Sequence, residues 1–402
     1  MKVGILTFHW SYNFGANLQA LATQNALKSL GVEPVIVNYR DPNKVAHYRK
    51  ITDPAQAEMH ESFCREYLNE SEVLTNSDEI EQFCNDSLDA VLVGSDAVFS
   101  LVANNSPRQW IKRVRSDSDP IFTMGRGRSI SPYFLPWKSP TDVKRGSIAA
   151  SSTGTQFYFL SLRHYGQAWR ALRNFDSLSV RDRWTRWMVR TLTLGTRNPQ
   201  LVVDPVFSLN THSPDFVQSI DDADNTVLLS GNFQDDWIES LAEELGDHNY
   251  QLVNLPNPDA SFENPHLHAT LSLPMGPREW FSRIAHASGF VGIRFHALVS
   301  SIVNRTPFIS VDIGPPALRP LYRLGSKYHD LCQRADCTSR YFDKNSIYRI
   351  PPSVLSNRLM DESTRAKADQ FAEIAATEFD RTLQTMLESF DMKTNPAAVT
   401  VA

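Results

Sequence analysis

The sequence predicts an α/β protein made of two doubly wound domains that face each other across a cleft. Short apolar runs alternate with segments of helical periodicity, and alternation of this kind is typical of parallel sheets covered by helices on both faces. The alternation comes in two successive series, separated by the polar and acidic stretch 213–225. A chain of 402 residues is also longer than one hydrophobic core usually serves.

The first series begins with the apolar run "KVGILTF". A segment with leucines and alanines near helical spacing follows and ends at Gly31, and a more polar helix-like stretch runs from about Asp53 to Cys84. The expected strands, each leading into a small or polar turn, lie within 2–8, 34–39, 88–99, 145–155, 175–185 and 200–209. We assign residues 1–210 to the N-terminal domain, on the acceptor side.

The second series, over 211–350, forms the expected donor-side domain. Its predicted strands lie within 226–232, 249–256, 289–295 and 306–312, with helices over 235–247, 280–290 and 296–305. The remainder, 351–402, holds a long amphipathic helix between Asp361 and Phe390. Its apolar stripe consists of Phe371, Ile374, Ala375, Phe379, Leu383, Met386, Leu387 and Phe390.

The charges are unevenly distributed along the chain. The net charge is −5, but residues 106–190 carry 13 arginines and 3 lysines against 5 aspartates, a local balance of +11, together with five of the eight tryptophans. Such a segment, with a basic insert at 106–145, draws in anionic ligands and raises the question of a nucleic-acid surface. The acidic remainder and the helix-surface pattern of the arginines favour a solvated basic face, and we expect no nucleic-acid partner.

Composition also limits the location and the cofactors of the protein. No apolar stretch is long enough for a signal peptide or a membrane span, so a cytoplasmic protein is expected. Four scattered cysteines do not make a disulfide scaffold, and His329, Cys332 and Cys337 lack an obvious fourth ligand for zinc. No metal is expected. Dinucleotide and Walker fingerprints are missing, so no nucleotide cofactor is expected either.

Candidate site residues follow from the rule that doubly wound folds bind ligands at the carboxyl ends of their strands. After the first strand come Asn13 and Gly15, where a missing side chain either allows close approach of a ligand or only serves the turn. Ser95, Asp96 and Ser151 follow later strands. The first two would bind sugar hydroxyls or simply cap the next helix.

Three further candidates carry cationic or titratable side chains. Arg181 directly follows the strand "SLSV", and its guanidinium would bind a carboxylate or phosphate, or form a structural pair with Asp182 or Asp204. Arg294 and His296 alternate around Phe295, so while the strand persists both face one side. A lone histidine at such a junction is more often structural, but two arginines beside it suit a small ligand bearing phosphate and carboxylate.

Several of these segments together resemble the polysaccharide pyruvyl transferase family. The resemblance runs from Lys2 to about Gly325 in family order. The matching segments are "GILTFHWSYNFGANLQALATQNALKSLGVEPVIVNYR", "VLVGSDAVF", "SPYFLPW", "SIAASSTG", "LSVRDR", "VVDPVF" and "VGIRFHALVSSIVNRTPFISVD".

The resemblance implies two Rossmann-like domains arranged as in B-type glycosyltransferases, with the C-terminal helix crossing back to the first domain. It implies transfer of a pyruvyl group from phosphoenolpyruvate, as co-substrate, onto a saccharide or lipid-linked saccharide, forming a cyclic ketal and releasing phosphate. Arg181 and Arg294 would bind the donor, and His296 would be the general acid. Peripheral membrane association would fit a lipid-linked acceptor.

The chain departs from the family pattern downstream of the last matching strand. Many members have a tyrosine and a lysine there, whereas this chain reads "SVDIGPPALRPLYRLG". Arg319 is the candidate to replace that lysine as a donor ligand. The alternatives to pyruvyl transfer are a B-type glycosyltransferase that uses a nucleotide sugar and a non-catalytic saccharide-binding relative. The sequence leaves the acceptor sugar, the oligomeric state and the role of the basic insert open.

Overall fold

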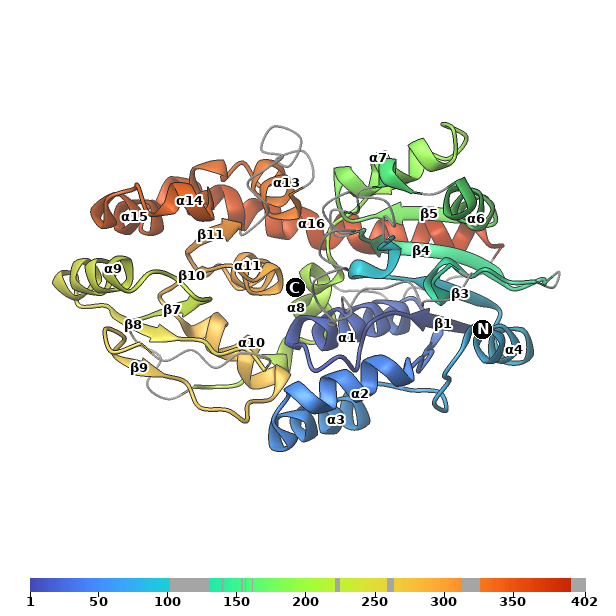
Figure 1. Cartoon of the computed structure of the whole chain (residues 1–402), viewed down its shortest axis with the longest axis horizontal. Helices are drawn as coiled ribbons and strands as arrows, with labels where there is room; N and C mark the ends of the chain where they lie inside the picture. Colours follow the sequence, from blue (N-terminus) through green and yellow to red (C-terminus); the bar gives the residue numbers. More distant parts are fainter. Residues whose placement is uncertain are drawn as a thin grey trace, which may run out of the picture.

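Two parallel six-stranded sheets lie side by side in the computed structural model, each with helices on both faces (Figure 1). The structure describes residues 1–101, 130–138, 141–152, 155, 157–160, 162–220, 225–258, 264–312 and 326–391. This arrangement confirms the predicted α/β class with two Rossmann-like domains.

The first sheet has the strand order β2-β1-β3-β4-β5-β6. Its strands are β1 (Lys2–Leu6), β2 (Glu33–Ile36), β3 (Ala90–Val93), β4 (Lys144–Ala150), β5 (Ser177–Val180) and β6 (Gln200–Leu201). The chain passes from β1 outward to β2 and then returns to the other side of β1 to form β3. The switch point of this sheet therefore lies between β1 and β3.

The second sheet has the order β12-β11-β10-β7-β8-β9. Its strands are β7 (Thr226–Ser230), β8 (Gln251–Asn254), β9 (Ala269–Thr270), β10 (Gly289–Gly292), β11 (Phe308–Asp312) and β12 (Tyr341–Asp343). Here the order reverses between β7 and β10, so the carboxyl ends of these two strands mark the second switch point.

The helices begin where the sequence supplies capping side chains. Asn13, Asp41, Asp53 and Asn76 each accept a hydrogen bond from a backbone N–H of the first turn that follows. The helices of the first half are α1 (Phe14–Ser29), α2 (Pro42–Ile51), α3 (Pro54–Tyr67), α4 (Ser77–Ser87), α6 (Leu162–Arg173) and α7 (Arg183–Leu192). Those that follow are α8 (Leu209–His212), α9 (Asp235–Asp247), α10 (Pro277–His286), α11 (Phe295–Val303), α13 (Lys327–Arg334), α14 (Lys344–Ile347), α15 (Pro352–Leu359) and α16 (Glu362–Ser389).

Short 3₁₀ turns complete the connections. They are η1 (Ala97–Phe99), η2 (Pro132–Phe134), η3 (Phe157–Phe159), η4 (Pro205–Ser208), η5 (Pro214–Phe216) and η7 (Thr338–Arg340). η4 lies between the two halves, in contact with both α1 and α16.

The long helix α16 crosses back from the second half to the first, as predicted (Figure 1). Near its end, Met386 and Phe390 pack against Gly146 of β4, and Thr382 accepts a hydrogen bond from Gln200. The predicted apolar stripe is mostly buried, but the inclusion of Ile374 is wrong because 49% of it is exposed. One continuous apolar core joins α1, α10, α11 and α16, so the two halves share buried surface.

The expected strands are present, with three differences. The sequence did not predict β9 and β12, because strands of two and three residues are too short to show an alternation of apolar and polar residues. The polar stretch 53–84 forms two helices rather than one, separated by residues that bridge to Ile36 and Tyr39. No helix in the described part of the chain is long and apolar enough to cross a membrane.

Candidate active site

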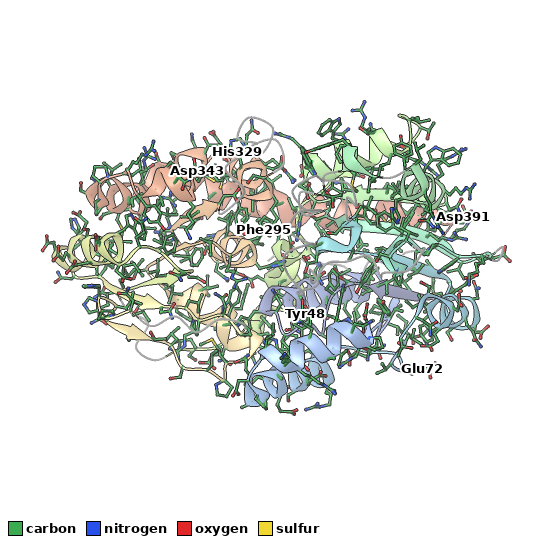
Figure 2. All side chains as sticks on the ribbon, viewed as in Figure 1. Tyr48, Glu72, Phe295, His329, Asp343 and Asp391 are labelled. Carbon is green, nitrogen blue, oxygen red and sulfur yellow. The ribbon has the colours of Figure 1, made fainter. Side chains whose placement is uncertain are left out.

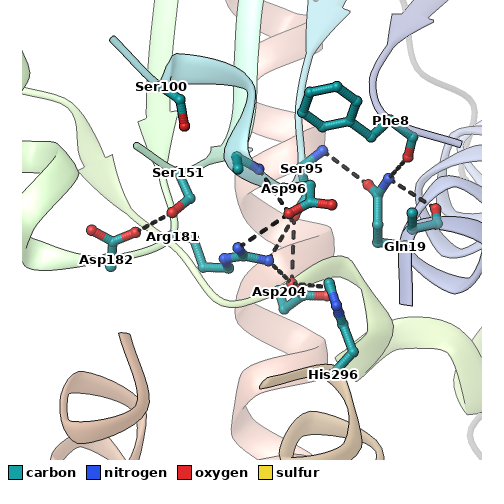
Figure 3. A network of polar contacts seen from close by, with 12 residues as sticks. Phe8, Gln19, Ser95, Asp96, Ser100, Ser151, Arg181, Asp182, Asp204 and His296 are labelled. Carbon is teal, nitrogen blue, oxygen red and sulfur yellow. Dashed lines mark hydrogen bonds and ion pairs between the residues drawn. The ribbon is translucent and has the colours of Figure 1, made fainter. Parts of the chain in front are cut away.

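The carboxyl ends of strands from both sheets meet in one polar network (Figure 3). The first half supplies Ser95 and Asp96 after β3, Arg181 after β5 and Asp204 after β6, and the second half supplies His296 at the start of α11. This location between the sheets, beside the β1/β3 switch point, is where doubly wound folds bind ligands.

Arg181 is the centre of this network and is only 3% exposed. Its Nη1 donates to the carboxylate of Asp204 and lies 3.4 Å from Ser95 Oγ, while Nη2 lies 3.9 Å from Asp96 Oδ1. Nε and Nη2 have no hydrogen-bond partner among the described residues. Arg181 thus forms the ion pair with Asp204 that the sequence left open, and still keeps two buried donor atoms for another acceptor.

Asp204 links this arginine to the histidine of the other half. Its Oδ2 lies 3.6 Å from His296 Nε2, and its Oδ1 accepts from Val206 N at the start of η4. Burial by itself raises the pKa of Asp204, but Arg181 and His296 lower it, and the resulting pKa lies well below the usual range. Asp204 is therefore a fixed carboxylate between the guanidinium of Arg181 and the imidazole ring of His296.

Gly15 provides the space in which His296 lies. A Cβ built on Gly15 would come 2.0 Å from His296 Cγ, closer than any two such atoms approach. The sequence left open whether Gly15 allows the close approach of a ligand or only serves the turn. In the structure another group does approach Gly15 closely, but that group is the ring of His296. Gly15 thus fixes the distance between α1 and the start of α11.

Two cationic side chains lie over the ring of Phe295, the first residue of α11. Arg181 Cζ and Lys327 Nζ each lie 4.6 Å from the ring centroid, within the range of cation–π attraction. In Figure 2 Phe295 lies near the middle of the molecule, between the two halves. The same residues, with Asp204 and Asp330, line a narrow cavity.

Lys327 is a site residue that the sequence reasoning missed. It begins α13 after Ser326, whose hydroxyl donates to Asp312 at the end of β11 and accepts from His329 N. Burial and then the positive charge of Arg181 lower the pKa of Lys327 from 10.5 to about 8. Lys327 lies two residues beyond Gly325, where the resemblance to the family ends, so a lysine follows the last matching strand in addition to the predicted Arg319. Arg319 itself lies outside the described residues.

Arg294 is the N-cap residue of α11 and is half-buried. Its charge lowers the pKa of Tyr328, although burial and Asp312 raise that pKa more strongly. The prediction that Arg294 and His296 share one face of a strand is wrong, because β10 ends at Gly292 and Phe295 already belongs to the helix. The turn between strand and helix, rather than a strand face, brings His296 to Asp204.

The proposed acceptor-side residues have identifiable structural partners. Asn13 caps α1, and Asp96 Oδ1 accepts from Ala97 N, so capping accounts for part of what both do. Ser151 donates to Asp182 Oδ2 at 2.7 Å, and Asp182 in turn caps α7. Of this group, Ser95 and Asp96 are the ones in direct contact with Arg181.

Gln19 joins the ends of β1 and β3 and was also missed. Its Nε2 donates to Thr7 Oγ1 and to the carbonyl of Phe8, and its Oε1 accepts from Ser95 N (Figure 3). A fully buried glutamine in the first turns of α1 therefore holds the turn that carries Ser95 and Asp96. Its position in "ANLQAL" was noted only as part of the family pattern.

A cavity of about 720 Å³ opens on the first half next to this turn. Ala97 and Ser100 line it, directly after Asp96. Its other walls combine aromatic and polar side chains: Phe8, Tyr39, Tyr133, Trp137, Asp41, Lys44, Asn76, Lys138, Arg170 and Asn174. Most of the basic insert lies outside the described residues.

The described residues contain no group of three His, Cys, Asp or Glu side chains that could hold a metal ion. All four cysteines are free and buried. Cys337 Sγ donates to the carbonyl oxygen of Cys332.

Comparison with known protein families shows to which family the chain belongs. The family model for polysaccharide pyruvyl transferases matches residues 13–315. The chain belongs to the polysaccharide pyruvyl transferase family. No curated protein sequence matches the chain.

Solved structures resemble this family member over nearly their whole length. S. aureus MnaA with UDP matches with a TM-score of 0.52 at 11% identity, covering 97% of both chains. A putative UDP-N-acetylglucosamine 2-epimerase from Listeria monocytogenes matches with a TM-score of 0.50 at 10% identity, covering 98% of both. At such identities the likeness concerns the fold alone, and it agrees with the B-type glycosyltransferase arrangement that the family implies.

Proposed function

We propose that this protein transfers the pyruvyl group of phosphoenolpyruvate onto two hydroxyls of a sugar, forming a cyclic ketal and releasing phosphate. Membership of the family supports this reaction. The observation that carries the proposal is the buried guanidinium of Arg181, which keeps Nε and Nη2 without hydrogen-bond partners among the described residues, next to His296 and Lys327.

The charges suit a donor with two anionic groups. Arg181 and Lys327 flank Phe295, and Arg294 is the residue directly before it. Arginine binds carboxylate or phosphate oxygens in pairs, and a desolvated lysine adds a point charge. We assign the carboxylate and phosphate of phosphoenolpyruvate to these three cations.

His296 is the group placed to move protons. The imidazolium would give a proton to the methylene carbon of the donor, and the electron pair of the double bond forms the new C–H bond. One sugar hydroxyl then attacks the cationic C2 carbon, and the C–O bond to phosphate breaks. The second hydroxyl attacks the same carbon and closes the ketal ring. Of the two hydroxyl protons released, one returns to His296 and the other leaves with phosphate.

Asp204 would stabilise the charged ring of His296 during this cycle. Its carboxylate stays ionised because Arg181 and His296 lower its pKa. A fixed negative charge 3.6 Å from Nε2 favours the positively charged ring without competing for the proton.

The acceptor sugar would occupy the 720 Å³ cavity beside the turn after β3. Aromatic faces and amide or carboxylate groups are the usual partners of sugar rings and hydroxyls. Lys44, whose pKa burial lowers, lies 4.7 Å from the centroid of the Phe8 ring and has no carboxylate partner within ion-pair distance among the described residues. Lys44→Gln should therefore raise the KM of the acceptor and leave the KM of phosphoenolpyruvate unchanged.

Incubation with phosphoenolpyruvate and a panel of glycans tests the reaction. We expect phosphate release that depends on the glycan, together with a mass gain equal to one pyruvyl ketal. Turnover of a nucleotide sugar with none of phosphoenolpyruvate would favour the glycosyltransferase alternative. Glycan binding without turnover of either donor would favour a non-catalytic relative.

A further inference from the structure

Exposed apolar side chains are concentrated on one part of the first half. Of the eight large apolar residues that are well exposed in the described part of the chain, four lie between residues 158 and 194. They are Tyr158, Leu162, Trp187 and Leu194, with exposed fractions of 43%, 93%, 45% and 73%. Single exposed apolar residues are normal on a protein surface, whereas a group of them calls for a partner.

These residues belong to neighbouring elements. Trp187 and Arg190 are spaced i, i+3 on one face of α7, and Leu194 follows two residues after the end of this helix. The ring of Phe157 lies 5.7 Å from Tyr158 and 5.0 Å from Trp187, and Tyr165 Oη donates to the carbonyl of Thr191, which fastens α6 to the end of α7. Figure 1 shows α6 and α7 together at the outer edge of the first half. We call this surface the α6–α7 face.

The backbone at Leu194 gives a second indication. Leu194 has φ +51°, in the left-handed region that asparagine and glycine favour over leucine. An exposed leucine there packs little and strains its backbone. The stability of the fold therefore does not explain why residue 194 is a leucine. Contact of its side chain with a binding partner would explain it.

The charges around these apolar residues are almost entirely positive. Residues 157–197 contain eight arginines, of which Arg181 is buried in the candidate site, and no lysine or glutamate. They contain only two aspartates, of which Asp182 is buried as the cap of α7. Arg170, Arg173 and Arg190 are exposed, and none of them forms an ion pair with a described residue. The surface thus combines aliphatic and aromatic side chains with uncompensated guanidinium groups.

We propose that the α6–α7 face binds the surface of an anionic lipid bilayer. Apolar side chains that enter the headgroup region, ringed by arginines that meet lipid phosphates, are the physical basis of peripheral membrane binding. A nucleic acid would use the arginines and aromatic rings but has no place for Leu162 and Leu194. α7 begins two residues after Arg181, so this face leads from the cleft toward the membrane.

Sedimentation with lipid vesicles tests the proposal without any substrate, so its outcome is independent of the proposed reaction. The full-length protein should bind vesicles that contain phosphatidylglycerol, bind much less to pure phosphatidylcholine vesicles, and dissociate at high salt. Leu194→Asn should weaken vesicle binding about tenfold or more, the effect of losing one buried leucine side chain. Because asparagine suits the left-handed backbone, the thermal midpoint should stay the same or rise. A second variant, Leu162→Ser, should weaken binding to a similar extent.

Ile374→Asn is the matched control, since Ile374 is equally an exposed aliphatic residue (49%) but lies on α16, away from this face. It should bind vesicles like the wild type. Equal binding to both vesicle types, or unchanged binding of the Leu194 and Leu162 variants, overturns the proposal. The proposal is also overturned if the protein does not bind vesicles but forms a dimer that the Leu194→Asn substitution dissociates.

Discussion

The ring of His296 lies against the backbone of Gly15, with its Cγ 2.0 Å from where a side chain of residue 15 would begin. The two residues are separated by most of the chain and lie in helices of different halves, Gly15 in α1 and His296 in α11. Their contact sets the position of the proposed general acid, and the residue in the first half therefore has to be glycine.

Gly15→Ala is expected to reduce the rate of transfer strongly, because the methyl group must push His296 away from Asp204. A displacement of about 1 Å in a catalytic group can reduce the rate on the order of a hundredfold. Steady-state kinetics and the thermal midpoint together measure the effect. Gly166→Ala is the matched control, since nothing lies within 4 Å of its added methyl group, and it should be neutral or slightly stabilising. Normal kcat in the Gly15 variant would show that the contact does not position His296.

His296→Ala and Arg294→Ala should separate catalysis from donor binding. Loss of the proton donor His296 should reduce turnover on the order of 100-fold or more, while phosphoenolpyruvate still binds. Loss of Arg294 should weaken donor binding itself by at least about tenfold, as for a charge-assisted hydrogen bond. Isothermal titration with phosphoenolpyruvate and single-turnover assays measure the two quantities. Near-normal rates in both variants would refute the assignment of the site.

Lys327 gives the donor site a pH dependence. Its pKa is lowered to about 8, so the side chain is charged below that pH and loses its proton above it. The KM of phosphoenolpyruvate should therefore rise above about pH 8, with little change in kcat. Lys327→Arg, which keeps its charge, should move this rise to higher pH, and Lys327→Met should raise the KM below about pH 8 and remove the rise above it. A profile that is the same in the arginine variant would assign the ionisation to another group.

Asp330 makes the stability of the folded protein depend on pH, at a contact between the two halves. It forms an ion pair of 3.3 Å with Arg183 of α7, but burial raises its pKa from 3.8 to about 6, and Arg334 and Arg183 offset this only in part. Between these two values the folded state holds a proton that the unfolded state has released, so stability falls as the pH rises from about 4 to about 6.

Asp330→Asn removes this titration and should therefore gain stability relative to the wild type as the pH rises. We expect a relative gain on the order of 1 kcal/mol between about pH 4.5 and about pH 7.5, measured by chemical denaturation at each pH. Parallel stability profiles of the two proteins would mean that Asp330 titrates normally. Asp380→Asn is a suitable control, because Asp380 also forms an inter-element pair, with His212, but is more exposed than Asp330.

The sequence predicted the architecture well because its signals are local. Apolar runs such as "VLLS" and "AVLV" are buried strands, and capping residues such as Asn13 and Asp53 mark helix starts. Strand ends also point to Arg181 and His296, since Arg181 directly follows β5 and His296 lies four residues after the end of β10. The partners of these residues were harder to find. The sequence offers Asp182 and Asp204 equally as partners of Arg181, and Lys327 lies beyond Gly325, where the family resemblance ends.

By itself, therefore, the sequence determined two doubly wound halves, a crossing C-terminal helix, and the residues that end each strand. Hydrophobic periodicity and caps act within a few residues, so they can be read along the chain. Only the tertiary structure decided that His296 lies against Gly15, that Arg181 pairs with Asp204, and that Lys327 shares the ring of Phe295. These contacts depend on how two sheets pack against one core, and no local pattern encodes the distance between residues that meet across it.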